Sequence, residues 1–254
     1  MTSIIRHPTE IFLFSLGLQW LAAYLGHVLR RRGGPLEDAE RGDFDTILRA
    51  TLTLAALIIG FSFSMAVSRY DERKAFERNE ANAIRTAYVR APLLPSAEAG
   101  QARRLLSKYA ELRIQFYVVS DPARLAKIDA ETGKLQDDLQ SIVTKVAVGQ
   151  PTPTVALVAV AVTDVLNSQG STQAAWWNRI PTAAWGMMLV VAFAANFLLG
   201  ASERRRTPVL LFVLPLIISA PIFLIADIDT PRAGVVRVVP DDLIALSHWI
   251  ESRP

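Results

Sequence analysis

The chain has 254 residues, of which 51% are hydrophobic and 20% are charged, and its formal net charge is +3. It contains no cysteine, which excludes disulfides, thiolate metal sites and a cysteine nucleophile, and it has no dense Lys/Arg stripe of the kind that binds nucleic acid. The apolar residues gather in long runs near both ends, while the middle is rich in charge. This distribution indicates an integral membrane protein.

The N-terminal part contains two predicted transmembrane helices, because a hydrocarbon core about 30 Å thick needs about 20 mostly apolar helical residues. The first covers residues 10–29 and is followed by three arginines. A cleaved signal peptide carries its positive charge before the apolar run, so we predict a retained helix. The second covers residues 47–67 and has no charged residue after Arg49.

Residues 68–180 form the polar middle, which we predict to be a small helical domain outside the membrane. Residues 70–90 lack Gly and Pro and are rich in Ala, Glu and Arg, so the second membrane helix should continue out of the bilayer through them. Breaks in the pattern then separate predicted helices at 97–119, at 122–148 with Asp121 as N-cap, and at 154–167. We interpret the short apolar run 155–162 as a buried part of this domain, with an interfacial or re-entrant segment as the alternative.

Two more transmembrane helices are predicted toward the C-terminus. One covers residues 182–201 and follows Trp176 and Trp177, which suit an aromatic belt at the membrane surface. The other covers residues 208–226 and contains two prolines, which membrane helices tolerate. A turn and an amphipathic helix at 241–251 follow, and this helix should lie on the membrane surface or dock on the polar domain. The predicted fold is therefore an all-α integral membrane protein, with four transmembrane helices in residues 1–67 and 181–226, a helical domain at 68–180 that extends the second span, and a C-terminal segment at 227–254.

Three stretches of the sequence, taken together and in this order, are similar to a known family. They are GFSFS at 60–64 leading to RYDER at 69–73, then EANAI at 80–84 with TAY at 86–88, and finally DIDTPRAG at 227–234. They resemble the bestrophin-like family of bacterial membrane proteins, over about residues 48–239. The residues that carry the family motif here are Glu80, Asn82, Tyr88, Asp227, Asp229, Pro231 and Gly234.

The resemblance implies a remote likeness to bestrophins, which are pentameric anion channels with a pore lined by the second membrane helix and with cytosolic helices below it. It implies a homo-oligomer, as a pentamer or tetramer, in the bacterial cytoplasmic (inner) membrane. The expected partners are then the lipid bilayer, further copies of the chain and inorganic ions, and nucleic acid is not among them.

The second predicted membrane helix offers two faces for such an assembly. Small residues recur at i, i+4 spacing and would let helices approach closely, namely Ala56, Gly60, Ser64 and Ser68. Larger residues on another face could form an apolar constriction that closes a pore by excluding water, namely Ile59, Phe63, Val67 and Tyr70. In the alternative interpretation, the small face packs within one protomer and the larger side chains meet lipid.

Charged residues follow where this helix leaves the membrane. Arg69, Glu72 and Arg73 form a ring at a pore mouth in one interpretation, and part of a solvated, salt-bridged cluster in the other. Further along, the face that carries Glu80 is expected to pack on the polar domain, with Glu80 paired to an arginine. Near the C-terminus, two carboxylates in DIDTP could bind a cation. They could equally cap a turn or pair with Arg232 and Arg237, and capping a turn is the commoner use of aspartate. We therefore predict no metal site.

The chain has no nucleophile-elbow, phosphate-loop, dinucleotide-binding or HExxH motif, so we predict neither an enzyme nor a cofactor. No charged residue lies near the middle of a predicted span, which argues against an ion-coupled pump. Gln19 and Asn196 are strongly polar but lie inside predicted spans, where hydrogen bonds between helices account for them. The predicted function is an ion-permeable channel. The alternative is a non-conducting scaffold or sensor whose polar domain binds a partner protein.

Two arguments about the sidedness of the polar domain oppose each other. The positive-inside rule favours cytoplasmic short loops, and the two short loops carry Arg30, Arg31, Arg32 and Arg41, and then Arg204, Arg205 and Arg206. The likeness to bestrophins implies the opposite orientation, with the helical domain in the cytosol.

Overall fold

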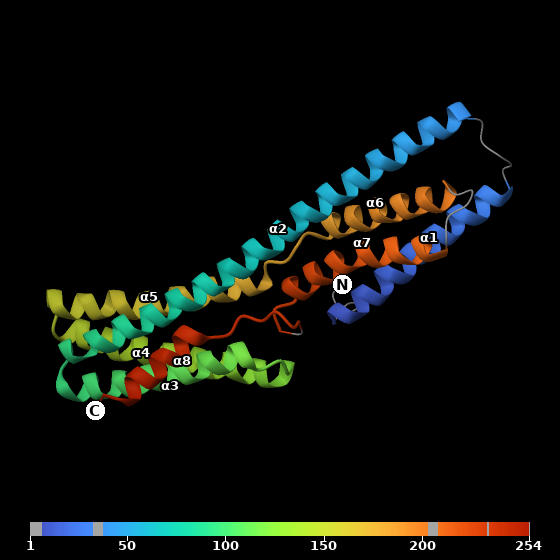
Figure 1. Cartoon of the computed structure of the whole chain (residues 1–254). Coiled ribbons are helices and arrows are strands. Elements are labelled where there is room, and N and C mark those ends of the chain that lie inside the picture. The colour runs from blue at the N-terminus through green and yellow to red at the C-terminus, as the bar shows by residue number, and fades with distance from the viewer. Residues whose placement is uncertain (1–6, 33–37, 203–207, 233, 254) are drawn as a thin grey trace. The chain divides into compact units, whose positions relative to one another are not determined.

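The computed structural model describes residues 7–32, 38–202, 208–232 and 234–253 (Figure 1). Three of the loop arginines, Arg204, Arg205 and Arg206, lie outside the described residues, as does the side chain of Arg41. The described part of the chain is almost entirely helical and contains no strand. Its elements in chain order are α1 Pro8–Arg32, α2 Asp38–Arg90, the 3-10 helix η1 Ala91–Leu93, α3 Ser96–Val118, α4 Pro122–Gly149, α5 Pro153–Trp177, α6 Thr182–Ala201, α7 Pro208–Asp229 and α8 Asp241–Glu251. The all-α membrane class is thereby confirmed.

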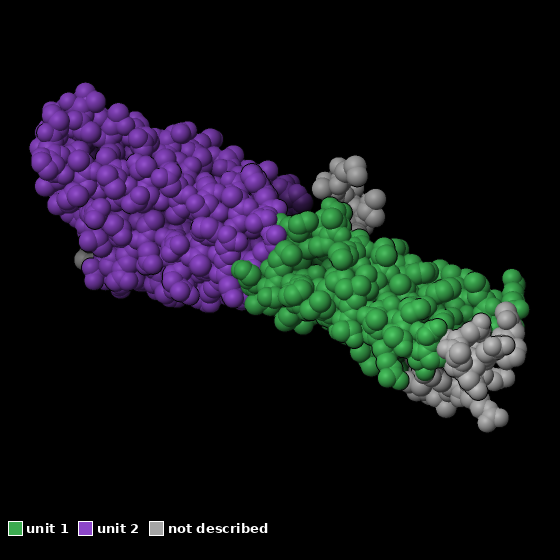
Figure 2. Space-filling view, turned by 90° about the horizontal axis from the view of Figure 1, so that it is seen from above, with its two compact units in different colours: residues 1–68, 179–236 green, residues 69–178, 237–254 purple. Residues whose placement is uncertain are grey.

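Two compact units divide the chain (Figure 2). Unit 1 consists of residues 1–68 and 179–236, and unit 2 consists of residues 69–178 and 237–254. Helix α2 contributes its first part to unit 1 and its second part to unit 2. It is continuous because no Gly or Pro interrupts the sequence between Gly60 and its end at Arg90.

Four helical segments in the described residues are long and apolar enough to cross a membrane, as predicted. They are Pro8–Arg32, Gly42–Leu93, Pro153–Ala201 and Phe212–Asp229. The third segment joins α5 to α6, and the part of it in unit 1 is α6, which begins and ends at the predicted residues 182 and 201. Unit 1 is therefore built from α1, the first part of α2, α6 and α7.

Helices α1 and α6 cross closely at two glycines. A Cβ on Gly26 would lie 2.0 Å from the carbonyl oxygen of Phe197, and a Cβ on Gly200 would lie 2.0 Å from the carbonyl oxygen of Ala23. No side chain can approach a backbone oxygen so closely, so the absence of a Cβ at both positions is what permits this crossing.

A buried polar network joins three helices of unit 1. Asn196 Nδ2 on α6 donates to Gln19 Oε1 on α1 at 2.7 Å. Gln19 Nε2 in turn donates to Ser15 Oγ at 2.9 Å and to Ser219 Oγ on α7 at 3.0 Å. The hydrogen bonds expected for Gln19 and Asn196 are thereby confirmed, and they satisfy polar groups that lipid could not hydrate.

Unit 2 packs α3, α4, α5, α8 and the second part of α2 around one hydrophobic core. Asp121 caps α4 by accepting a hydrogen bond from the backbone N–H of Arg124 at 2.8 Å, as predicted. The apolar run 155–162 lies in this core through Val155, Val158, Ala161 and Val162. Docking of α8 on this unit places Leu243, Leu246 and Ile250 in the same core.

Helix α5 differs from its prediction at the C-terminal end. It continues to Trp177 instead of stopping at residue 167, because residues 168–177 contain no proline and their one glycine, Gly170, is tolerated in the helix. Trp176 is consequently buried in unit 2, with its ring 5.3 Å from that of Phe116. The prediction of a membrane-belt role for both tryptophans is therefore wrong for Trp176, whereas Trp177 is 74% exposed.

Candidate functional site

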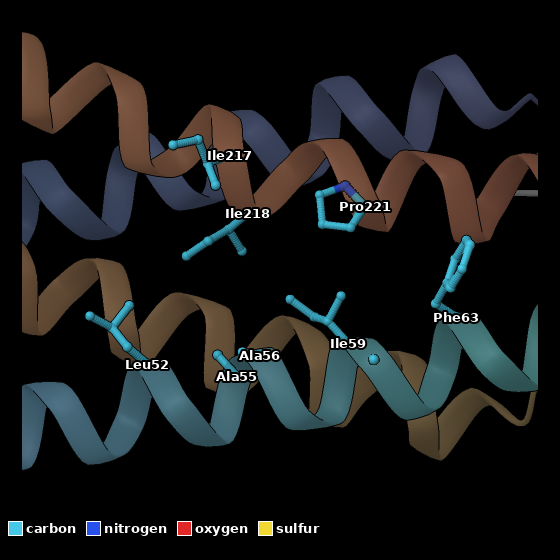
Figure 3. Close-up of a pocket in the computed structure, with 9 residues that line it drawn as sticks. Leu52, Ala55, Ala56, Ile59, Phe63, Ile217, Ile218 and Pro221 are labelled. Carbon is cyan, nitrogen blue, oxygen red and sulfur yellow. The ribbon is translucent and has the colours of Figure 1, made fainter.

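The membrane part of α2 faces an apolar groove of about 440 Å³ that it forms with α7 inside unit 1 (Figure 3). In Figure 3, Ile59 on α2 points toward α7, whose Ile218 and Pro221 lie opposite. The side chains that line the groove are Leu52, Ala55, Ala56, Ile59, Gly60 and Phe63 from α2, and Ile217, Ile218 and Pro221 from α7. None of the described residues that line it is charged, so the groove in the protomer is suited to a lipid tail or to a helix of a neighbouring copy.

The two faces predicted on this part of α2 meet in that groove. Ala56 and Gly60 from the small-residue face line it together with Ile59 and Phe63 from the larger apolar face. Ile59 is also packed against a small buried cluster that contains Ile218. Phe63 is 37% exposed, so of the two larger side chains it is the better placed to meet something outside the protomer.

The remaining residues proposed on these faces lie further along α2. Ser64 and Ser68 are exposed, and Val67 is half-buried. Tyr70 belongs to unit 2, where it packs against the hydrophobic core. Tyr70 therefore already has a packing role within the protomer, while the two serines remain accessible.

A third set of side chains on the same part of α2 was not predicted from the sequence. Leu57 and Phe61 are 52% and 66% exposed, which places them among the large apolar residues of α2 that protrude most. Their i, i+4 spacing continues to Met65. That helical spacing was the signal that could have identified them as one exposed stripe.

The charged residues at the start of unit 2, Arg69, Glu72 and Arg73, differ in burial and in their hydrogen-bond partners. Arg73 is fully buried, and its guanidinium donates to the carbonyl oxygens of Ala175 at 3.2 Å and Asn178 at 3.1 Å. It thus satisfies carbonyls at the C-terminal end of α5, a favourable place for a cation. Arg69 hydrogen-bonds the side chain of Asn178, and Glu72 is exposed. A pore-mouth role for Arg73 does not fit its burial, because no part of its side chain reaches the surface of the protomer.

Side chains in the next turns of α2 form hydrogen bonds with the start of the C-terminal helix α8. Glu77 is buried, and its carboxylate accepts a hydrogen bond from the backbone N–H of Leu243, in the first turn of α8, at 2.9 Å. Lys74 Nζ donates to the carbonyl oxygen of Val239 at 2.7 Å and to Asp241 Oδ2 at 2.9 Å. Glu77 therefore does the work of an N-cap for α8, whose own N-cap residue Pro240 provides no side-chain hydrogen bond.

Glu80 is paired with an arginine, as expected, and both charges are completely buried. Arg113 Nε on α3 donates to Glu80 Oε1, and Thr172 Oγ1 on α5 donates to Glu80 Oε2 at 3.2 Å. Burial raises the pKa of the nearby phenols of Tyr109 and Tyr117, and the negative charge of Glu80 raises it further. Both phenols therefore stay neutral, and the cluster joins three helices through one ion pair.

The other two motif residues on α2, Asn82 and Tyr88, follow Glu80 along the helix. Asn82 is exposed beside α8, and Tyr88 is buried with its ring 5.8 Å from that of Trp249 in an edge-to-face contact. Arg103 lies over the Tyr88 ring, with its guanidinium carbon 5.0 Å from the ring centre. The motif thus marks the place where α2, α3 and α8 meet.

The DIDTP motif forms a turn in unit 1. The Asp227 carboxylate accepts hydrogen bonds from the backbone N–H groups of Val235 and Val236, both at 2.8 Å, and Asp229 accepts one from Ile180 at 3.0 Å. Pro231 is buried in the turn, and a Cβ on Gly234 would lie 2.5 Å from the carbonyl oxygen of Asp227. The Asp227 carboxylate therefore caps the turn, whereas Asp229 ties the end of α7 to the segment that precedes α6. Within the described residues, no group of three or more His, Asp or Glu side chains is placed to hold a metal ion.

Comparison with known proteins identifies the family. Residues 16–243 match the family model named Bestrophin-like domain. The chain belongs to the bestrophin-like family. A crystal structure of a bacterial bestrophin homolog from Klebsiella pneumoniae, solved by Zn-SAD phasing, matches with a TM-score of 0.61 at 17% identity, covering 94% of this chain and 95% of that one. A mutant of that homolog matches with a TM-score of 0.65 at 15% identity, covering 96% and 97%. No curated protein matches the chain.

The family match at residues 16–243 includes all the motif residues found in the sequence of this bestrophin-like protein. The structural matches extend over nearly the whole chain, so the shared fold includes both the apolar helices and the polar helical unit. The protein is accordingly a membrane protein of the bestrophin-like family.

Proposed function

We propose that this bestrophin-like protein assembles into a homo-oligomer in the bacterial inner membrane and forms an ion-permeable pore lined by the membrane part of α2. The observation that carries the proposal is the low burial of this span. Within one protomer, 17% of the apolar 18-residue stretch of this span is buried. The corresponding shares in the other three candidate spans are 33%, 33% and 50%. A span so little covered by its own protomer has the most surface to share with other copies.

The residue types on this span support contact with protein. Ala56, Gly60, Ser64 and Ser68 are all exposed in the protomer, and small residues let helices of neighbouring subunits approach closely. The span has no charged residue between Arg49 and Arg69. A pore lined by it would therefore be apolar at its narrowest part and would close by excluding water.

The proposed lining keeps Phe63 as its central residue, with Ile59, Val67 and Tyr70 on either side. Ile59 and Tyr70 are partly used in packing within the protomer, so Phe63 should have the largest influence on permeation. The proposed mouth keeps Glu72, which is exposed, and Arg69, which is half-buried. Arg73 is left out because it is fully buried.

Ion flux through reconstituted liposomes tests the proposal. Phe63→Ser should raise flux by about tenfold, which corresponds to lowering the barrier by about 1.4 kcal/mol, because a hydroxyl keeps an apolar constriction wet. The matched control is Phe14→Ser on α1, since Phe14 is 63% exposed and lies outside the proposed pore, and its flux should equal that of the wild type.

Equal flux in Phe63→Ser, Phe14→Ser and protein-free liposomes would contradict a pore lined by α2. Correct insertion of both variants must first be shown by protease protection of the reconstituted protein. The non-conducting scaffold or sensor would then become the better interpretation.

A further inference from the structure

A second groove, about 210 Å³ in volume, lies in unit 2 between α2 and α8. It is separate from the residues proposed for the pore. Its floor is apolar, since Ala81 and Leu246 are buried, and its rim is polar. The lining residues are Ala81, Asn82 and Arg85 from α2, and Asp242, Ala245, Leu246 and Trp249 from α8.

The guanidinium of Arg85 is positioned by an aromatic ring. Its central carbon lies 4.7 Å from the centre of the Trp249 ring, and that of Arg253 lies 4.2 Å from the centre of the same ring. Stacking uses the flat face of a guanidinium and leaves its in-plane N–H groups free to bind a carboxylate through two parallel hydrogen bonds. Within the described part of the chain, no acceptor takes a hydrogen bond from the Arg85 guanidinium, and the side-chain amide of Asn82 is also without one.

The negative charge of the groove is already partly compensated. Asp242 lies with one carboxylate oxygen 3.7 Å from Arg78 Nε. Arg85 and Arg253 then leave an excess of positive charge around Trp249. A single negative charge placed at Arg85 is therefore favoured, while a second one near Asp242 is disfavoured.

The size and floor of the groove limit the ligand further. An apolar cavity of about 150 Å³ binds benzene, so a groove of about 210 Å³ has room for a ring or short chain with one polar group. The apolar floor is suited to the body of such a molecule, and the rim is suited to its charged end.

We propose that this groove is a binding site for a small organic monocarboxylate. The carboxylate accepts two hydrogen bonds from Arg85 and one from the Asn82 amide, and the apolar body rests on Ala81 and Leu246. Because the groove is formed by α2 on one side and α8 on the other, the ligand holds these two helices together. Ligand binding in this groove does not require the chain to conduct ions.

Isothermal titration of the full-length protein in detergent tests the site, with benzoate as the probe and benzamide as its neutral counterpart of the same shape. Benzoate should bind saturably, with a Kd on the order of 1 mM for so small a ligand. Benzamide should bind about tenfold more weakly because it lacks the charge that Arg85 recognises. Phthalate, which carries a second carboxylate, should also bind more weakly than benzoate.

Two variants and one control assign the site to these residues. Arg85→Gln should weaken benzoate binding by about tenfold, and Asn82→Asp, which places a negative charge on an exposed residue, should do the same without affecting folding. Arg104→Gln changes an exposed arginine on α3 outside the groove and should bind benzoate as the wild type does.

Three results would overturn the assignment. They are the lack of saturable benzoate binding to the wild type, equal affinity for benzoate and benzamide, and unchanged binding in Asn82→Asp.

Discussion

At the scale of single residues, two buried charges hold unit 2 together. Glu80 and Arg113 have no exposed surface, and Arg113 also lies over the Phe116 ring at 4.2 Å. Taking both charges out of water is costly, so such a pair stabilises a fold only when both partners and their hydrogen bonds are present. Thr172 supplies a further hydrogen bond, and α2, α3 and α5 are thus tied at one point.

Removing one partner of this pair should destabilise the protein strongly. Arg113→Met leaves the Glu80 carboxylate buried without a cation, which costs about 3–5 kcal/mol, so the thermal midpoint of unfolding in detergent should fall clearly. The double variant Glu80→Leu/Arg113→Met should recover much of the loss, because no unpaired charge remains. Lys108→Met, on the exposed face of the same helix, is the control and should change stability by less than about 0.5 kcal/mol. Equal midpoints for Arg113→Met and the wild type would refute this role.

At the scale of elements, glycine decides how closely the membrane helices of unit 1 pack. Gly26 and Gly200 let the backbones of α1 and α6 touch, whereas a Cβ on Gly186 of the same α6 would meet nothing within 4 Å. Two glycines of one helix therefore have different roles. Their positions in the sequence do not distinguish them, because the partner backbone comes from a segment that is distant along the chain.

This difference gives a matched pair of substitutions on α6. Gly200→Ala puts a methyl group 2.0 Å from the carbonyl oxygen of Ala23, so the two helices must separate and the thermal midpoint should fall. Gly186→Ala has open space, and the better helix propensity of alanine should leave stability unchanged or raise it by up to about 1 kcal/mol. Thermal unfolding followed by circular dichroism in detergent measures both, and equal losses in the two variants would contradict the close crossing.

At the scale of the whole molecule, assembly should depend on the exposed face of α2. Gly60 offers a clean test, because a Cβ there would meet nothing within 4 Å in the protomer. The protomer therefore has room for a side chain at this position, at the groove between α2 and α7. Gly17 on α1 is likewise open and serves as the control.

Native mass spectrometry of the detergent-solubilised protein should give one ring-sized species, a pentamer or a tetramer. Gly60→Leu should shift the population toward smaller species, because a bulky side chain prevents close approach of neighbouring helices. Gly17→Leu should keep the assembly of the wild type. A wild-type protein that is only monomeric or dimeric would leave no central axis for α2 to line, and the proposed pore would have to be abandoned.

Much of this protein follows from its sequence alone. The need for about 20 apolar residues per span predicted four membrane helices, and α6 begins and ends where the pattern of residues 182–201 placed it. Local chemistry also predicted the Asp121 cap and the continuity of α2, since both depend on neighbours within one or two turns.

Only the tertiary structure decided which polar residues are used within the fold. Arg73 was proposed for a pore mouth and is buried at the end of α5, and Trp176 was proposed for a membrane belt and packs on Phe116. The sequence indicated that Glu80 needs an arginine, but the choice of Arg113 rests on the packing of α3 against α2. The physical reason is the same in each case: a buried charge or ring is stabilised by groups that are distant along the chain, and only packing brings those groups together.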